Sequence, residues 1–273
     1  LLVINSVEKI ILGLETFYDV LTSVEKIGQV ADLSLEEEFD TENTNFCYAD
    51  ITLETEKIKF KFPDSKNTIL NDISLKIDQG ERIVINGENG SGKTTLIRIL
   101  SGLIKPTTGS FYINDDTFKK IDLKQYRSQI GSVIYGETPF EGTIHENITF
   151  NDPSITQEDL KWAIDGVQLT SYIKSLPESL ETKIFPEGRQ LSSSNAQKIV
   201  LARSIIHKPK ILFYEDPTDT MDEKIANEII DFITAKEHKW TIIVSSKNPY
   251  WKTKCNREII MQNGRIQLDT KTL

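Results

Sequence analysis

The sequence predicts an α/β fold in which helices flank a mostly parallel sheet. Three short, fully apolar runs are typical of buried parallel strands, and they lie at residues 83–85, 211–214 and 242–244. The first run leads into a glycine-rich octet at residues 87–94, and the periodicity of a helix follows at residues 96–100. The predicted sheet therefore carries a glycine-rich turn between one of its strands and a helix.

The glycine-rich octet is the most specific motif of the chain, with the pattern G-x-x-x-x-G-K-T. Glycines let backbone N–H groups turn inward around phosphates, and the positive end of the following helix favours an anion. In such a loop Lys93 would reach the β- and γ-phosphates, and the Thr94 hydroxyl would bind Mg²⁺. The loop predicts a nucleoside triphosphate site made of Gly87, Glu88, Asn89, Gly90, Ser91, Gly92, Lys93, Thr94 and Thr95.

Composition excludes several other classes of protein. The net charge of −9 argues against a dedicated nucleic-acid binder. The two cysteines, Cys47 and Cys255, indicate a reduced compartment, and the three histidines form no zinc-binding pattern. No segment reaches the roughly 18 apolar residues of a membrane span. Because the chain begins with Leu1, we expect a fragment whose membrane segments lie upstream.

The first part of the chain, residues 1–38, is expected to be an amphipathic helix and a linker. Its apolar residues recur in steps of three and four, as in Val7, Ile10, Leu14, Phe17, Leu21 and Val24. This seam fits a helix packed on its own domain and equally a helix that faces a partner or a membrane. Acidic residues 36–38 and polar residues 40–44 predict the linker.

The second part, residues 39–273, is expected to be one domain. Alternating residues at 51–54 and 58–62 predict two half-buried antiparallel strands, and residues 70–77 predict a third. Residues 126–190 have a mostly helical pattern, in which Thr156 and Asp159 would cap one helix. Near the end of the chain, Asn263-Gly264 predicts a hairpin turn.

The order of motifs over about residues 50–273 resembles the nucleotide-binding domain of ATP-binding-cassette (ABC) transporters of the exporter type. Residues 191–195, Leu-Ser-Ser-Ser-Asn, stand where this family has its L-S-G-G-Q signature, so two glycines are replaced by serine. Residues 219–222 stand at the D-loop, and residues 139–148 resemble the segment that faces the transmembrane coupling helices. The resemblance implies a P-loop NTPase fold: a RecA-like, mostly parallel sheet, an N-terminal antiparallel β subdomain and a helical subdomain.

The resemblance also implies ligands and partners. ATP and Mg²⁺ would lie in a sandwich dimer, between the phosphate loop of one domain and the signature of another, where Ser192 would donate to the γ-phosphate. Phe62 would stack on adenine, or it is an ordinary aromatic residue at a strand end. The partners would be a transmembrane domain upstream in the same chain and a second nucleotide-binding domain, in a homodimer or a heterodimer. The domain would lie at the cytoplasmic face of a membrane and bind no nucleic acid.

Four further positions depart from the family pattern, and they concern the groups that would bind Mg²⁺ and direct the attacking water. The family has Asp-Glu where this chain has Glu215-Asp216, so Glu215 would support Mg²⁺ through water and Asp216 would be the general base. Asp216 is one methylene shorter than glutamate, and a misplacement of about 1 Å can cost roughly 100-fold in rate. Tyr135 aligns with the glutamine that senses Mg²⁺, and Lys247 with the switch histidine. His238 precedes the strand and is expected to be a solvated turn residue.

These observations favour one reading and leave two others open. The favoured function is the ATP-binding half of an exporter that binds MgATP and hydrolyses it slowly or not at all, and a hydrolysis-competent subunit could be its partner. The first alternative is a fully active ABC ATPase in which Asp216 and Lys247 act as base and switch. The second is a soluble, non-transport ABC protein that uses ATP as a dimerisation switch.

Overall fold

The chain divides into two compact units, Leu1–Asp40 and Thr41–Leu273. The computed structural model describes residues 2–32, 50–63, 65 and 67–271. The predicted linker residues 36–38 and 40–44 lie outside the described residues, and so does Cys47.

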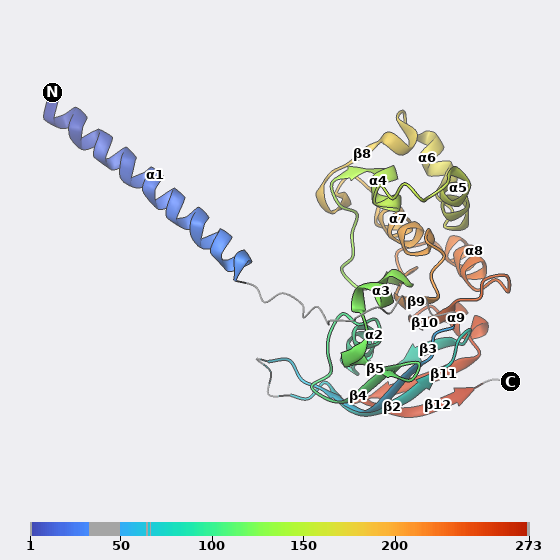
Figure 1. Cartoon of the computed structure of the whole chain (residues 1–273). Coiled ribbons are helices and arrows are strands. Elements are labelled where there is room, and N and C mark those ends of the chain that lie inside the picture. Colours follow the sequence, from blue (N-terminus) through green and yellow to red (C-terminus); the bar gives the residue numbers. More distant parts are fainter. Residues whose placement is uncertain (1, 33–49, 64, 66, 272–273) are drawn as a thin grey trace. The chain divides into compact units, whose positions relative to one another are not determined.

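The first unit contains one long helix, α1 (Leu2–Ala31) (Figure 1). This confirms the helix that the apolar periodicity predicts for this segment. Of the predicted seam, Leu14, Phe17, Leu21 and Val24 all have exposed side chains, so α1 offers an apolar stripe along its described surface. Among the helices that the structure describes, α1 included, none has the length and hydropathy of a membrane span.

The second unit is built on a six-stranded sheet. All neighbouring pairs from β11 to β6 are parallel, and only β12 at the edge runs antiparallel, which confirms the mostly parallel sheet. The neighbouring strands β10 and β9 are almost wholly buried, as a strand covered on both faces must be. In sheet order the strands are β12 (Arg265–Lys271), β11 (Arg257–Gln262), β3 (Arg82–Asn86), β10 (Thr241–Ser245), β9 (Ile211–Glu215) and β6 (Ile130–Val133).

A four-stranded sheet in the order β2-β1-β4-β5 forms the antiparallel part of this unit. The prediction of two strands at residues 51–54 and 58–62 is wrong, because one continuous strand, β1, runs from the first segment into the second. Its pairing shifts register between Thr55 and Ile58, and Lys57 there has a φ of 49°, so the strand contains a bulge. A bulge interrupts the alternation of apolar and polar residues, and in the sequence this looks like the end of one strand and the start of another. The strands are β1 (Leu53–Phe60), β2 (Leu70–Ile77), β4 (Thr108–Ile113) and β5 (Asp116–Thr117).

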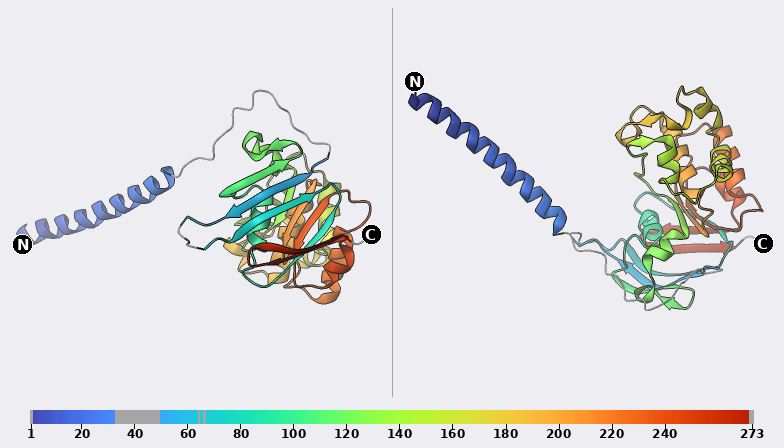
Figure 2. Two further views of the ribbon diagram at one scale, coloured as in Figure 1. Left: turned by 90° about the horizontal axis from the view of Figure 1, so that it is seen from below. Right: turned by 45° about the horizontal axis from the view of Figure 1, so that its top comes forward.

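The helical elements gather mostly at one end of the unit, with the antiparallel sheet at the other end (Figure 1; Figure 2, right). The predicted cap is confirmed, since Thr156 and Asp159 form a reciprocal capping box at the start of α5. The elements are α2 (Lys93–Leu100), α3 (Leu123–Ser128), α4 (Ile144–Thr149), α5 (Gln157–Gly166), α6 (Thr170–Ser175), α7 (Ser193–Ile205), α8 (Glu223–Ile233) and α9 (Tyr250–Lys254), the 3₁₀ turns Phe118–Lys120, Ser179–Glu181 and Pro186–Gly188, and a small sheet of β7 (Gly142–Thr143) and β8 (Lys183–Ile184).

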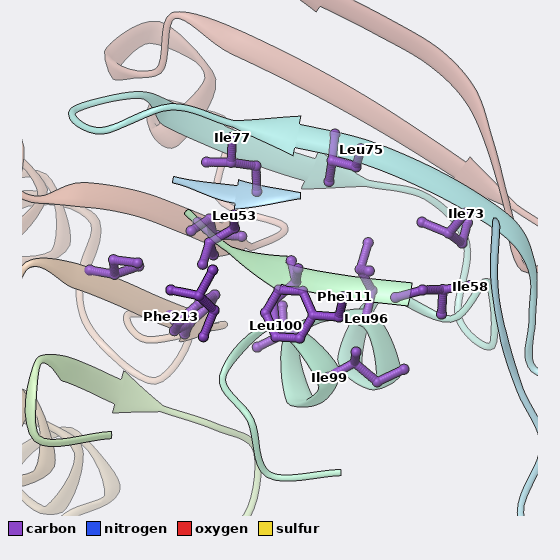
Figure 3. Close-up of a cluster of buried hydrophobic side chains, with 14 of the residues drawn as sticks. Leu53, Ile58, Ile73, Leu75, Ile77, Leu96, Ile99, Leu100, Phe111 and Phe213 are labelled. Carbon is purple, nitrogen blue, oxygen red and sulfur yellow. The ribbon is translucent and has the colours of Figure 1, made fainter. Parts of the chain in front are cut away.

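Helix α2 is buried between the two large sheets. Figure 3 shows Leu96, Ile99 and Leu100 of α2 among side chains from the antiparallel strands, with Phe213 of β9 at the other side. All four side chains are fully buried. The helix that follows the glycine-rich loop is therefore held from both sides, and its first turn cannot shift without disturbing this core.

A second core joins the helical end to the opposite face of the parallel sheet, and it contains an unexpected aromatic cluster. The His238 ring stacks on Trp240, with ring centres 4.3 Å apart, and meets Trp162 and Phe232 edge to face. His238 lies in a turn, as predicted, since its N–H donates to the carbonyl oxygen of Ala235 at 3.2 Å. The prediction that its side chain is solvated is wrong in part, because the residue is half-buried and its ring packs against apolar rings. Trp162 and His238 are 76 positions apart, so no local sequence pattern predicts their contact.

We predict that Leu96→Ala lowers the free energy of unfolding by about 2–5 kcal/mol, because it leaves a cavity between the two sheets. Urea unfolding followed by circular dichroism measures the change. Leu103→Ala is the matched control, since the Leu103 side chain is 51% exposed, and it should cost less than about 1 kcal/mol. Equal losses in the two variants would contradict the assignment of α2 to the core.

Candidate functional site

The carboxyl ends of β3, β9 and β10 meet at one edge of the parallel sheet, where loops most often build binding sites. A cavity of about 760 Å³ lies there. Of the residues predicted from the sequence, it is lined by Phe62, Gly87, Asn89, Gly90, Gly92, Lys93, Thr94, Thr95, Tyr135, Glu215, Asp216 and Lys247. Glu88, Ser91 and Ser192 do not line it.

The loop between β3 and α2 has a backbone that requires glycine at two positions. Gly87 has a φ of 147°, and a Cβ there would lie 2.2 Å from the carbonyl oxygen of Met261. Gly92 has a φ of 101°, and its Cβ would lie 2.6 Å from Cδ2 of Leu70. The loop is thus pressed against β11 and β2, and no side chain caps the first turn of α2. The N–H groups of that turn remain suited to an anion.

Lys93 closes the loop from within. Its Nζ donates to the carbonyl oxygens of Gly87 and Glu88, each at 2.8 Å. Burial lowers the pKa of Lys93 below its usual value, while Asp216 and Glu215 oppose that shift and Lys247 adds to it. The ammonium therefore lies within electrostatic reach of both carboxylates at the end of β9.

Glu215 joins the loop to the sheet. One carboxylate oxygen accepts a short hydrogen bond from the Thr94 hydroxyl, and the other accepts from the backbone N–H of Tyr135 at 3.2 Å. Hydroxyl and carboxylate oxygens are ligands that Mg²⁺ prefers, usually together with waters and substrate phosphates. Within the described residues no group of three or more His, Cys, Asp or Glu could hold a metal by itself. The Thr94 and Glu215 oxygens therefore fit an ion that a phosphate also ligates.

Asp216 is held by backbone contacts from two sides. Its Oδ1 accepts from the N–H of Lys247 at 2.9 Å, and its own N–H donates to the carbonyl oxygen of Ser245 at 2.8 Å. Asp216 has a φ of 43°, a left-handed conformation that few non-glycine residues adopt. Tyr135 is 78% exposed, and its backbone N–H donates to the neighbouring Glu215. The carboxylate thus has a fixed direction at the sheet edge.

Gln197 is a site residue that the sequence reading missed. Its Nε2 donates to the carbonyl oxygen of Asp216 at 2.8 Å, and its Oε1 accepts from the Thr220 hydroxyl at 2.6 Å. Gln197 thereby ties α7 to the turn after β9. Its position two residues beyond the Leu-Ser-Ser-Ser-Asn segment was the available signal.

A second missed group lines the far wall of the cavity. The Glu258 carboxylate accepts from Nδ2 of Asn86 at 2.8 Å and pairs with Nζ of Lys252 at 2.8 Å. The hydrogen bond to Lys252 is the largest cause that lowers the pKa of Glu258. No sequence pattern predicts the contact between Asn86 and Glu258, because the two residues are 172 positions apart.

Phe62 and Ser192 occupy separate places. Phe62 lines the cavity, is 42% exposed and meets Phe60 edge to face at 4.8 Å. Ser192 is exposed at the N-terminus of α7, where its hydroxyl accepts from the N–H of Asn195 at 3.2 Å. The structure brings the phosphate loop, the acidic pair and Lys247 together, and it leaves Ser192 outside that cavity.

Comparison with known proteins gives concordant matches in sequence. The family model described as ABC transporter matches residues 70–219, more than half of the chain. The ATP-dependent permease MDL1 of Candida albicans is 32% identical over 80% of this chain and 33% of its own length. The alpha-hemolysin translocation ATP-binding protein HlyB of Escherichia coli O157:H7 is 30% identical over 93% of this chain and 36% of its own length. The chain therefore spans about a third of the length of these relatives.

A similar fold is known from experiment. The structure of a bacterial Atm1-family ABC exporter with ATP bound superimposes with a TM-score of 0.83. The match covers 94% of this chain and 45% of the exporter chain, at 21% sequence identity.

Proposed function

Because the chain belongs to the ABC transporter family, we propose that it is the ATP-binding domain of an exporter that binds MgATP and hydrolyses it slowly or not at all. The observation that carries the proposal is the glycine-rich loop, which Thr94 joins to Glu215 at the end of β9. The chain's similarity to HlyB, a translocation ATP-binding protein, supports the exporter assignment.

The proposed binding uses groups that line the cavity. The loop N–H groups and Lys93 bind the phosphates, once the ammonium exchanges the carbonyls of Gly87 and Glu88 for phosphate oxygens. Thr94 and Glu215 would hold Mg²⁺, which when bound would neutralise phosphate charge. The exposed Phe62 offers a ring for adenine at the cavity edge.

Slow hydrolysis is proposed from the groups that would direct a water. Phosphoryl transfer depends on positioning, so groups displaced by about 1 Å lower the rate more than the affinity. Asp216 has a shorter reach than glutamate. The exposed phenol of Tyr135 lacks an amide's paired donor and acceptor, and the Lys247 ammonium is a point charge that cannot orient a carboxylate as an imidazole does.

The proposed partners lie outside this chain's 273 residues. Two relatives, of which the match covers 37% and 41%, are named as both ATP-binding protein and permease, which supports an upstream transmembrane domain in the same protein. The domain would then lie at the cytoplasmic face of a membrane. The exposed Ser192 at the start of α7 would meet the nucleotide of a second nucleotide-binding domain.

One observation favours a second candidate, a fully active ATPase. The backbone N–H of Lys247 donates to the Asp216 carboxylate at 2.9 Å, so Asp216 is oriented and residue 247 lies beside it at the sheet edge. An adjusted pocket that uses Asp216 as the base and Lys247 as the switch would explain this contact.

Lys93→Ala should weaken MgATP binding by about 100-fold or more, since it removes charge-assisted hydrogen bonds to phosphate. Equilibrium dialysis with labelled ATP measures the affinity. Lys174→Ala is the control, because Lys174 is exposed on α6, and it should bind as the parent chain does. Unchanged affinity in Lys93→Ala would contradict the proposal that the phosphate loop binds ATP.

Asp216→Glu should raise the rate of phosphate release by about tenfold or more, because the longer side chain recovers about 1 Å of reach. A phosphate-sensor assay at saturating MgATP measures the rate. Asp115→Glu makes the same change at an exposed turn and should leave the rate unaltered. A lower rate in Asp216→Glu would support the fully active candidate.

Ser192→Ala should reduce the fraction of dimer that forms on addition of MgATP, since the hydroxyl would donate to the partner's γ-phosphate. Light scattering with and without nucleotide measures the fraction. The substitution also removes a helix cap worth about 1 kcal/mol. Thr156→Ala removes a cap on α5 and controls for that loss, so it should leave the dimer fraction intact. A stable dimer without nucleotide would argue against a nucleotide-driven interface.

A further inference from the structure

A second cavity, of about 720 Å³, lies at the amino ends of β3, β9 and β10. It is lined by Arg82, the first residue of β3, by Lys210 just before β9, and by Trp240 just before β10. These strands are parallel, so this cavity opens at the sheet edge opposite the phosphate loop. Its volume falls within the range of small-molecule sites, roughly 300–1,000 Å³.

The lining of this cavity is basic in an acidic protein. Its cationic residues are Arg82, Lys208, Lys210, Lys236 and Lys239, against Asp50 and Glu237, while the whole chain carries a net charge of −9. Lys208 is paired with Asp159. In the part of the chain that the structure describes, no side chain pairs with Lys236 or Lys239, which are both exposed. Two lysines at the rim are thus available to an anion.

One wall of the cavity is aromatic. The rings of His238 and Trp240 are stacked with an angle of 28° between their planes, and Trp162 lies 5.7 Å from His238. The Lys208 ammonium lies 5.7 Å from the centre of the Trp162 ring. Aromatic faces beside cationic side chains suit a planar, electron-rich ring that also carries negative charge.

His238 also presents an unsatisfied polar atom. Its Nε2 is shielded from solvent and has no hydrogen-bond partner among the described residues. Burial is the largest cause that lowers the pKa of His238, so the ring is neutral near pH 7. A buried polar nitrogen without a partner is uncommon. A ligand that bears an amino or hydroxyl group would satisfy it once the His238 side chain turns toward the cavity that it lines.

The frame of the cavity is already formed. The Gln79 side chain donates to the carbonyl oxygen of Lys239 at 2.8 Å and accepts from the N–H of Ile51 at 3.1 Å. The N–H of Gly80 donates to the Thr241 hydroxyl at 2.9 Å. These contacts hold the turn before β3 against the start of β10, so a ligand would not have to order them.

We propose that this second cavity binds a nucleotide, with Lys236 and Lys239 at its phosphates and the wall of Trp162, His238 and Trp240 at its base. A phosphate ester with an aromatic base matches the three features of the cavity: unpaired cations, ring faces and an unsatisfied imidazole nitrogen. The cavity is small and the chain is acidic, which disfavours a nucleic-acid strand in this place. The proposal is independent of the function assigned to the phosphate loop.

The test uses the full 273-residue chain carrying Lys93→Ala, so that the phosphate loop contributes little to binding. Trp162 and Trp240 line the cavity, so tryptophan fluorescence responds to binding there. Trp251 lies in α9 beside the phosphate-loop cavity, so the double variants described below assign the signal to one cavity. Titration with ADP up to about 1 mM should give a saturable change in fluorescence. Absence of a saturable change in a chain that is folded by circular dichroism would overturn the proposal.

Two matched double variants, made in the same Lys93→Ala background, locate the signal. Lys236→Gln with Lys239→Gln should weaken ADP binding by about tenfold. Lys174→Gln with Lys224→Gln removes the same charge from exposed positions on α6 and α8 and should leave the affinity unchanged. Equal affinities in the two double variants would overturn the site. Inorganic pyrophosphate should bind more weakly than ADP, and equal binding would overturn the contact with the base.

Discussion

The turn between β3 and α2 constrains the whole site. It is pressed so closely against β11 and β2 that a Cβ at Gly87 or Gly92 would collide with Met261 or Leu70. Its far end is fixed as well, because α2 is buried between the two sheets (Figure 3). A rigid turn presents its N–H groups in one arrangement, and an anion that fits does not have to order them. This rigidity is why the loop forms a site before any ligand arrives.

The acidic pair at the end of β9 serves two different neighbours. Glu215 faces the loop through Thr94, whereas Asp216 faces β10 through Ser245 and Lys247. The two adjacent carboxylates thus face different neighbours, and in our proposal Glu215 would support Mg²⁺ while Asp216 would act on water. In our account the first task is intact and the second is weakened, since the groups around Asp216 have the wrong length or shape to direct a water.

The sequence predicted the parts of this structure that depend on local pattern. Buried apolar runs identified β3, β9 and β10, and the octet identified the loop, because each of these signals is contained in a few consecutive residues. The bulge at Lys57 was missed, since a shift in pairing looks like a break between strands. Contacts over long intervals were also missed, among them Asn86 with Glu258 and the packing of His238 between aromatic rings. Such contacts depend on the tertiary fold and leave no periodic trace.

The central claim is that a triphosphate pocket persists here while the groups that would direct water at the γ-phosphate are displaced or replaced. The most direct measurement pairs a calorimetric titration of the parent chain with MgATP and a phosphate-release assay on the same sample. The account predicts saturable binding with release slower than about 0.1 s⁻¹, some 100-fold below a typical turnover. Release at about 10 s⁻¹ would contradict the loss of hydrolysis, and the absence of saturable binding would contradict the pocket itself.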